Sequence, residues 1–438
     1  MEKLLTKASQ SAQQAEVLRI REESINIRYE DREIKKIETK NTEGSSLRLI
    51  KDERLGTTCG TSPLDRDEML TQALTSAKYG DKVELSFPDI QPVNTVKTYD
   101  NKIAKLSIEE MCRTGDAIIK KIMHLAPDLA PDLSISKGVS NTAINNSRGV
   151  QADYDITNYT IGVSLRIKGS KASVAKWDSS SKFFEFPDQK IEELIKEYRL
   201  CDIRHSVTTK KMPVIFTPQS AWSLLYRVYA AINGDALYRG ISPLADKIGS
   251  KIFDEQITII DNPTMNFGMQ SCPFDDEGVP TNRKNIIEKG VFKEFIFDLA
   301  TAAKQKTKST GNGFKRGFWG GGIETPPNPV VINFTLLPGK MTMEEMIKDI
   351  KEGIIVDEVL GFHSGNIIQG EFSMNVGVGY LVQNGVIKGR VMDAMVAGNI
   401  YESFNKLVGL GNKLEISFVG YLPAMYFKEM SIAGKPST

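Results

Sequence analysis

The stretch SCPFDDEGVPTNRKNIIEKGVFKEFIFDLATAAKQKTKSTGNGF, residues 271–314, contains the signals that decide the fold. Its acidic triplet, residues 275–277, precedes a glycine and a proline, so these carboxylates could bind a cation, hold a peptide amine or cap backbone amides in a turn. Gly290 stands between two apolar runs, where a glycine predicts a tight hairpin turn. Residues 310–314 lack the lysine of a phosphate-binding loop, so we expect a mobile loop beside a cleft that an extended peptide could approach.

Beyond this stretch the chain is rich in glycine and in short apolar runs. Residues 379–391, GYLVQNGVIKGRV, repeat the pattern of residues 285–295, with Gly385 in the place of Gly290, and predict a second hairpin. Duplication of one unit and chance similarity between two common turn sequences would both give this pattern. Apolar spacing and cap residues predict helices over residues 219–232, 343–352 and 400–407.

Toward the N-terminus the sequence predicts a mixture of strands and helices. A polar turn at residues 51–54 separates two strand-like runs, and Ser107 with Glu110 forms the sequence of a capping box at the start of a helix. The polar stretch 204–213 is the best candidate for a domain boundary. We therefore expect an α+β protein, with a sheet-and-helix domain over residues 1–205 and a strand-rich domain over residues 206–438.

The composition of the 438-residue chain restricts its function. The 56 basic and 55 acidic residues leave a formal net charge of +1, so no general attraction to nucleic acid or to anionic membranes is expected. The N-terminus lacks the apolar segment of a signal peptide, and no window approaches the roughly 18 to 20 apolar residues of a membrane span. The sequence therefore predicts a cytoplasmic protein without a membrane partner.

Residues 271–314 closely resemble a segment of the TldD/PmbA family, whose members are also labelled modulators of DNA gyrase. The similarity extends to GFHSGNIIQGEFSMNVGVGYLVQNG, residues 361–385, and to AGNIYESFNKLVGLGN, residues 397–412. The resemblance implies the TldD/PmbA-type fold and a role in a heterodimeric zinc peptidase that acts on peptides and unfolded segments. In that family the TldD-type subunit has an HExxxH helix, which offers two imidazoles for zinc and a glutamate as general base, while a cysteine completes the ligand set.

This chain departs from the zinc motif at four positions. In LLYRVYAAINGD, residues 224–235, Tyr226 and Ala231 stand at the histidine positions and Arg227 at the glutamate, while Val376 stands at the cysteine. A guanidinium cannot lose its proton to act as a base. Residues 232–249 resemble the PmbA/TldE branch, which lacks the motif. The resemblance implies a non-catalytic subunit without its own metal, paired with a zinc-containing TldD-type subunit or forming a homodimer when alone.

Two other functions stay open at the level of the sequence. His363 is flanked by glycines and precedes Glu371 by eight residues, so a self-sufficient hydrolase could use this pair or the acidic loop, although we favour a loop-ordering hydrogen bond for His363. The gyrase label suggests a DNA-associated regulator, which the balanced charge disfavours. Both family branches share the acidic loop, which suggests a structural or substrate-cleft role. We predict a substrate cleft with the following residues: Asp275, Asp276, Glu277, Gly311, Asn312 and Gly313.

Overall fold

The N-terminal half is built on one antiparallel sheet of six strands, in the order β3-β2-β1-β4-β5-β6. The computed structural model describes residues 1–61, 65–170, 172–317, 320–418 and 420–434. Alternate residues of a strand point to opposite faces, and in β5 the alternation of Tyr159, Ile161 and Val163 buries one face of the sheet. The strands are β1 (Gln14–Glu30), β2 (Glu33–Lys51), β3 (Arg54–Thr61), β4 (Asp132–Asn146), β5 (Gln151–Arg166) and β6 (Ser173–Ser180).

β2 is much longer than its neighbour β3. β1 pairs with β2 along residues 33–50, whereas β3 pairs only with residues 44–51. Residues 33–43 therefore form a free edge, with no second neighbouring strand in the part of the chain that the structure describes. Residues 33–41 of this edge are all exposed.

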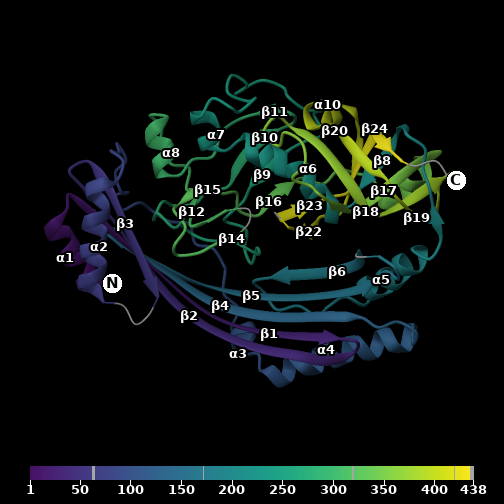
Figure 1. Ribbon diagram of the computed structural model, residues 1–438, viewed down its shortest axis with the longest axis horizontal. Helices are drawn as coiled ribbons and strands as arrows, with labels where there is room; N and C mark the ends of the chain where they lie inside the picture. The colour runs from purple at the N-terminus through teal and green to yellow at the C-terminus, as the bar shows by residue number, and fades with distance from the viewer. Residues whose placement is uncertain (62–64, 171, 318–319, 419, 435–438) are drawn as a thin grey trace.

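Helices cover one face of this sheet at both of its ends, and the C-terminal half lies over the opposite face (Figure 1). Ala8 and Ala73 pack with Val17 and Leu47 at one end, and α4 buries Ile118 near the other. Ser107 and Glu110 make the predicted capping box of α4. The helices are α1 (Glu2–Ser11), α2 (Arg66–Tyr79), α3 (Asn101–Lys105), α4 (Ile108–Leu125) and α5 (Asp188–Leu200).

The C-terminal half contains a sheet that closes on itself. Its strands follow the order β17-β8-β24-β20-β18-β19-β7, with β21 beside β24, and β17 also pairs with β18. Strands β17, β8, β24, β20 and β18 therefore form a small barrel. The strands of this sheet are β7 (Arg204–His205), β8 (Lys210–Phe216), β17 (Glu352–Leu360), β18 (Glu371–Gln383), β19 (Val386–Val391), β20 (Met395–Asn399), β21 (Leu407–Leu410) and β24 (Met425–Ala433).

A second sheet lies beside the barrel, in the order β11-β10-β9-β16-β23-β22. Its strands are β9 (Ile259–Asp261), β10 (Lys284–Glu288), β11 (Val291–Phe292), β16 (Phe334–Leu336), β22 (Glu415–Ser417) and β23 (Gly420–Leu422). Two short pairs are β12 (Gly313–Phe314) with β15 (Asn328–Pro329) and β13 (Arg316–Gly317) with β14 (Gly320–Gly321). The helices of this half are α6 (Pro218–Ala231), α7 (Gly234–Tyr238), α8 (Leu299–Lys304), α9 (Met343–Asp349), α10 (Ile400–Ser403) and the 3-10 turn η1 (Phe404–Lys406).

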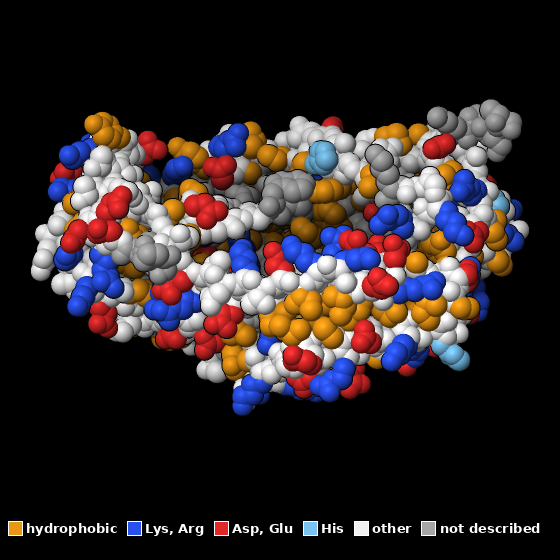
Figure 2. Space-filling view, turned by 60° about the horizontal axis from the view of Figure 1, so that its bottom comes forward, with side chains coloured by type: hydrophobic (Ala, Val, Ile, Leu, Met, Phe, Trp, Pro, Cys, Tyr) orange, Lys and Arg blue, Asp and Glu red, His pale blue; other side chains and the backbone are white. Residues whose placement is uncertain are grey.

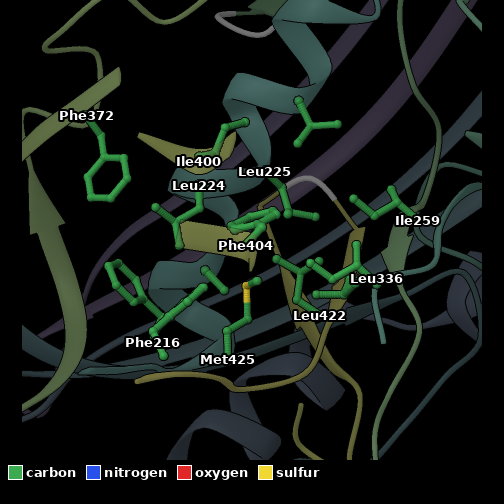
Figure 3. Close-up of a cluster of buried hydrophobic side chains, with 14 of the residues drawn as sticks. Phe216, Leu224, Leu225, Ile259, Leu336, Phe372, Ile400, Phe404, Leu422 and Met425 are labelled. Atoms are coloured by element: carbon green, nitrogen blue, oxygen red, sulfur yellow. The ribbon is translucent and has the colours of Figure 1, made fainter. Parts of the chain in front are cut away.

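The core of the C-terminal half lies around α6. Figure 3 shows Leu224 and Leu225 of α6 among side chains from several strands, including Phe216 of β8 and Met425 of β24. These four side chains are fully buried, and each contributes about 1.5–3 kcal/mol by leaving water. A second core joins the two halves, because Tyr159 of the N-terminal sheet belongs to the same apolar cluster as strands of the barrel.

The predicted hairpins are confirmed. The polar turn at residues 51–54 joins β2 to β3, and Gly290 and Gly385 form the turns β10–β11 and β18–β19 with φ angles of 76° and 73°. Two predicted helices are shorter than expected. α9 ends at Asp349 because the buried Ile350 is already extended, and α10 gives way at Phe404, whose ring is fully buried, to a 3-10 turn.

The predicted domain boundary falls in a region of short strands. β7 and the start of β8 lie within residues 204–213, and both belong to the sheet of the C-terminal half. The division at residues 205 and 206 stays a prediction. Among the described residues, no helix combines the length and the apolar character that crossing a bilayer requires.

Candidate functional site

α6 is the helix that the sequence resemblance aligns with a zinc-binding helix. It starts at Pro218, where a proline is favoured in the first turn, and the Thr217 N–H donates to the Val356 carbonyl at 3.0 Å. Ten of its 14 residues are buried. Any polar side chain on this helix must therefore find partners inside the protein.

Arg227 is the largest fully buried side chain in the described structure, with none of its surface exposed. Its guanidinium donates to four backbone carbonyls: Ser223 at 2.6 Å, Glu371 at 2.7 Å, Phe362 at 2.8 Å and Ser364 at 3.0 Å. Burial lowers the pKa of Arg227 to about 10, so the side chain is still a cation at neutral pH. Desolvation of a charge costs several kcal/mol, which these hydrogen bonds offset. Arg227 thus ties residues 362–371 to α6.

The other three positions of the zinc motif are apolar or phenolic. Tyr226 packs with its ring centroid 5.7 Å from that of Phe362, and burial raises the pKa of its hydroxyl. Ala231 is fully buried, and Val376 is 8% exposed. Among the residues that the structure describes, no group of three or more His, Cys, Asp or Glu side chains could hold a metal ion. These residues do not fit zinc, because none offers an imidazole, thiolate or carboxylate.

His363 lies on the loop that Arg227 fixes, Glu371 is the first residue of β18 directly after this loop, and both residues are exposed. The Glu371 carboxylate accepts a hydrogen bond from the Asn366 N–H at 3.3 Å, while its backbone carbonyl accepts from Arg227. The ring of His363 lies edge-on to Phe362, with 5.6 Å between centroids. Arg227 thus holds this loop through its backbone carbonyls, and a catalytic role for His363 or Glu371 stays a prediction.

The acidic loop holds itself together through buried carboxylates. Asp275 accepts hydrogen bonds from the N–H groups of Glu277, Val279 and Gly313, at 2.8–3.0 Å. Burial raises the pKa of Asp275 well above its ordinary value, and the neighbouring Glu277 raises it further. Three roles were predicted for the acidic triplet. Asp275 has one of them, because its carboxylate caps backbone amides.

Glu277 connects the acidic loop to the N-terminal sheet. Its carboxylate accepts from Arg48 of β2 at 2.7 Å and from the Leu299 N–H, at the start of α8, also at 2.7 Å. Arg48 also donates to Glu16 of β1 at 2.7 and 2.9 Å, and all three charged side chains are at most 4% exposed. Burial raises the pKa of Glu16 to about 7. Glu16, Arg48 and Glu277 thereby form an ionic bridge between the two halves of the molecule.

The prediction of a mobile loop at residues 310–314 is wrong for the residues at its centre. Gly311, Asn312 and Gly313 are buried, and the Asn312 side-chain amide donates to Asp261 at 2.8 Å and to the Val330 carbonyl at 2.7 Å. A substituent on Gly313 would lie 2.1 Å from the Glu277 carboxylate. Glycine is therefore required for close packing at Gly313, beside the acidic loop.

Of the six residues predicted to line a substrate cleft, the structure places one in a cavity. Asp276 borders a cavity of about 350 Å³ between the N-terminal sheet and the loops near β12 and β13, together with Tyr154 and Arg316. Asp276 accepts from the Lys315 N–H at 2.8 Å, and burial raises the pKa of its carboxyl. Figure 2 shows the molecular surface hollowed, with hydrophobic side chains inside the hollow. Substrate contact by the other five would require the buried loops to move.

Sequence reasoning missed Glu16 and Arg48, which are central to the ionic bridge. They occupy facing positions on β1 and β2, in the register of the strand pair. Each stands among apolar residues, in QAEVLRI and SSLRLIK. Two opposite charges within apolar strand sequences are the signal that could have indicated a buried ion pair.

Two family models match the chain. The model described as the PmbA/TldA metallopeptidase C-terminal domain matches residues 209–434, and the model described as PmbA/TldA metallopeptidase domain 1 matches residues 15–77. Metalloprotease PmbA of Escherichia coli O157:H7 is 31% identical over 229 residues, which cover 52% of this chain and 47% of that protein.

Similarity to other proteins extends over the whole chain. An uncharacterized protein of Methanocaldococcus jannaschii is 24% identical over 444 residues, covering 98% of each chain. The crystal structure of TldE from Thermococcus kodakarensis superposes with a TM-score of 0.91 at 24% identity, covering 99% of this chain and 100% of that one. The fold predicted from the sequence is therefore confirmed.

Proposed function

Because the chain belongs to the PmbA/TldD metallopeptidase family, we propose that it is a TldE-like subunit that works with a TldD-type partner and leaves zinc chemistry to that partner. The observation that carries this proposal is the state of Arg227. A buried cation, fixed by four carbonyl groups, stands where the resemblance places the general base. It can neither accept a proton nor tolerate a divalent cation beside it.

The remaining positions support the same proposal. A metal site needs at least three convergent ligands, and Tyr226, Ala231 and Val376 supply no imidazole, thiolate or carboxylate. The fixed loop 362–371 gives this chain a rigid surface beside α6, which suits a subunit that shapes a peptide cleft. In this role the chain is cytoplasmic and contributes to proteolysis or peptide maturation through its partner.

Hydrolysis of a labelled unfolded polypeptide tests the proposal. The assay compares this chain alone, a TldD-type protein alone, the two mixed, and the mixture with EDTA. We expect cleavage only in the mixture and its loss with the chelator, which removes the partner's zinc. A partner whose HExxxH glutamate is replaced by glutamine is the matched control and should be inactive in the mixture.

Cleavage by this chain alone would contradict the proposal and would favour the self-sufficient hydrolase. In that case His363→Ala should abolish the activity if His363 acts on the substrate. This alternative rests on the exposed positions of His363, in the loop before β18, and of Glu371, at the start of β18. Failure to be retained on a DNA column even at low salt would exclude the DNA-associated regulator.

A further inference from the structure

A second cavity lies where the two halves meet, and none of the four zinc-motif positions borders it. It has a volume of about 420 Å³ and is bordered by α5 and β6 on one side and by β17, β18 and the first turn of α6 on the other. Pockets of about 300–1,000 Å³ are typical of small-molecule sites. Neither the family resemblance nor the proposed function gives this cavity a role.

Charged side chains inside the cavity are only partly paired. Lys176 donates to one oxygen of Glu197 at 2.7 Å, whereas the second oxygen of Glu197 is buried without a hydrogen-bond partner in the described structure. Asp357 is 7% exposed and accepts from the Thr217 hydroxyl at 2.7 Å through one of its oxygens. Lys176 is attracted by both carboxylates, which keeps its pKa raised against the effect of burial.

The rest of the lining favours a cation with an apolar body. Five acidic and three basic residues border the cavity, so negative charge is in excess. Leu200, Ile347 and Ile387 supply an aliphatic wall. The first turn of α6 would by itself favour an anion, but Asp357 already lies beside it and is bonded to its cap residue.

We propose that this cavity binds an organic cation, in which a primary ammonium group faces Asp357 and Glu197 and a short aliphatic chain lies against Leu200, Ile347 and Ile387. The ammonium group would donate to the Asp357 oxygen that does not accept from Thr217, and the buried second oxygen of Glu197 would have to turn toward the cavity to accept a hydrogen bond as well. Its aliphatic chain would displace water from the apolar wall. This proposal is independent of the peptidase function.

The experiment is isothermal titration of the full chain with n-pentylammonium, 1-pentanol and pentanoate. These three probes have similar size but positive, zero and negative charge. We expect millimolar or tighter binding of pentylammonium and at least about tenfold weaker binding of the other two, because a charge-assisted hydrogen bond is lost. Equal binding of all three probes, or no binding of pentylammonium, would overturn the proposal.

Variants locate the site. Asp357→Asn and Glu197→Gln should each weaken pentylammonium binding about tenfold. Glu192→Gln is the matched control, since Glu192 lies on the same helix as Glu197 but is exposed and does not border the cavity. Thermal unfolding verifies that each variant is folded. If the two cavity variants bind as the wild type does while folded, the site is not this cavity.

The pH dependence gives a further readout. Burial, together with the negative charge of Asp357, raises the pKa of Glu197 to about 7 against the lowering effect of Lys176. The groups around Glu197 are Lys176 of β6, Asp357 of β17, Glu193 of α5 and the Tyr380 hydroxyl of β18, which donates to the Glu197 backbone carbonyl. Pentylammonium binding should weaken as the pH falls from 8 to 6 and Glu197 is protonated. Glu197→Gln should remove most of this dependence, and its persistence would contradict the assignment.

A competition arm distinguishes the two natural sources of an alkylammonium group. A lysine-containing peptide that displaces pentylammonium would identify the ligand as a polypeptide side chain. If the peptide does not compete while pentylammonium binds, the ligand is a free amine.

Discussion

Arg227 has a structural role at the position where the sequence resemblance places a general base. Its hydrogen bonds reach Ser223 within α6 and three carbonyls in residues 362–371, so the loop and the helix share one donor. The resemblance aligns this position with the glutamate of an HExxxH helix, which has to accept a proton. In this chain the Arg227 side chain donates to the backbone instead and connects residues 362–371 to α6.

Replacement of Arg227 by methionine should lower the free energy of unfolding by about 3 kcal/mol, because buried carbonyls lose their donors. Urea unfolding measures this change, and hydrogen exchange should show faster exchange in residues 362–371. Arg239→Met is the control. Arg239 is exposed and forms only a weak pair with Asp235, so its loss should cost less than about 0.5 kcal/mol. Similar losses for the two variants would show that Arg227 is not a structural anchor.

At the scale of elements, the two related hairpins differ in what surrounds their turns. Both glycines have positive φ angles, which favour glycine in either turn. A Cβ on Gly290 would lie 2.2 Å from the Phe253 carbonyl oxygen, whereas the nearest atom to a Cβ on Gly385 is 3.1 Å away. The hairpin β10–β11 is therefore packed more closely than β18–β19.

Gly290→Ala should consequently be more harmful than Gly385→Ala. We expect the second variant to lose about 1–2 kcal/mol from backbone strain alone, and the first to lose more because backbone must also move. Thermal or urea unfolding of the two variants measures the difference. Equal losses of unfolding free energy in the two variants would mean that the backbone around Phe253 can shift at little energetic cost.

Local signals in the sequence predicted these elements. The contacts between residues far apart in the chain could not be predicted. Turn glycines, capping boxes and apolar spacing gave the hairpins, the start of α4 and the position of α6. The prediction of a mobile loop at residues 310–314 was wrong, because a glycine-rich sequence is compatible both with a mobile loop and with a closely packed one. Only the distant partners Asp261 and Glu277 decide between the two.

At the scale of the whole molecule, the bridge between Glu16, Arg48 and Glu277 joins the N-terminal sheet to the acidic loop. The zinc-motif positions were predicted from the family resemblance alone, and they stay a prediction. The bridge could not be predicted, since Arg48 and Glu277 are 229 residues apart in the chain. Burial gives this cluster its importance, because an unpaired charge in such surroundings is costly.

Arg48→Met should lower the free energy of unfolding by about 3–5 kcal/mol, because two carboxylates stay buried without their cation. Arg21→Met, which removes an exposed pair with Glu43 on the same two strands, should cost at most about 1 kcal/mol. Urea unfolding gives both values, and proteolysis under native conditions should show the two halves separating more often in Arg48→Met. An equally small loss in both variants would contradict the bridge's role.

The free edge of β2, residues 33–43, affects how separate copies of the chain behave during folding. An edge strand of this length is a template for intermolecular strand pairing, the first step of fibrillar aggregation. Ile34 and Ile37 are 41% and 45% exposed on it. The lysines at positions 35, 36 and 40 oppose such pairing, since an incoming strand would have to desolvate their ammonium groups. These lysines therefore disfavour strand pairing between separate copies of the chain.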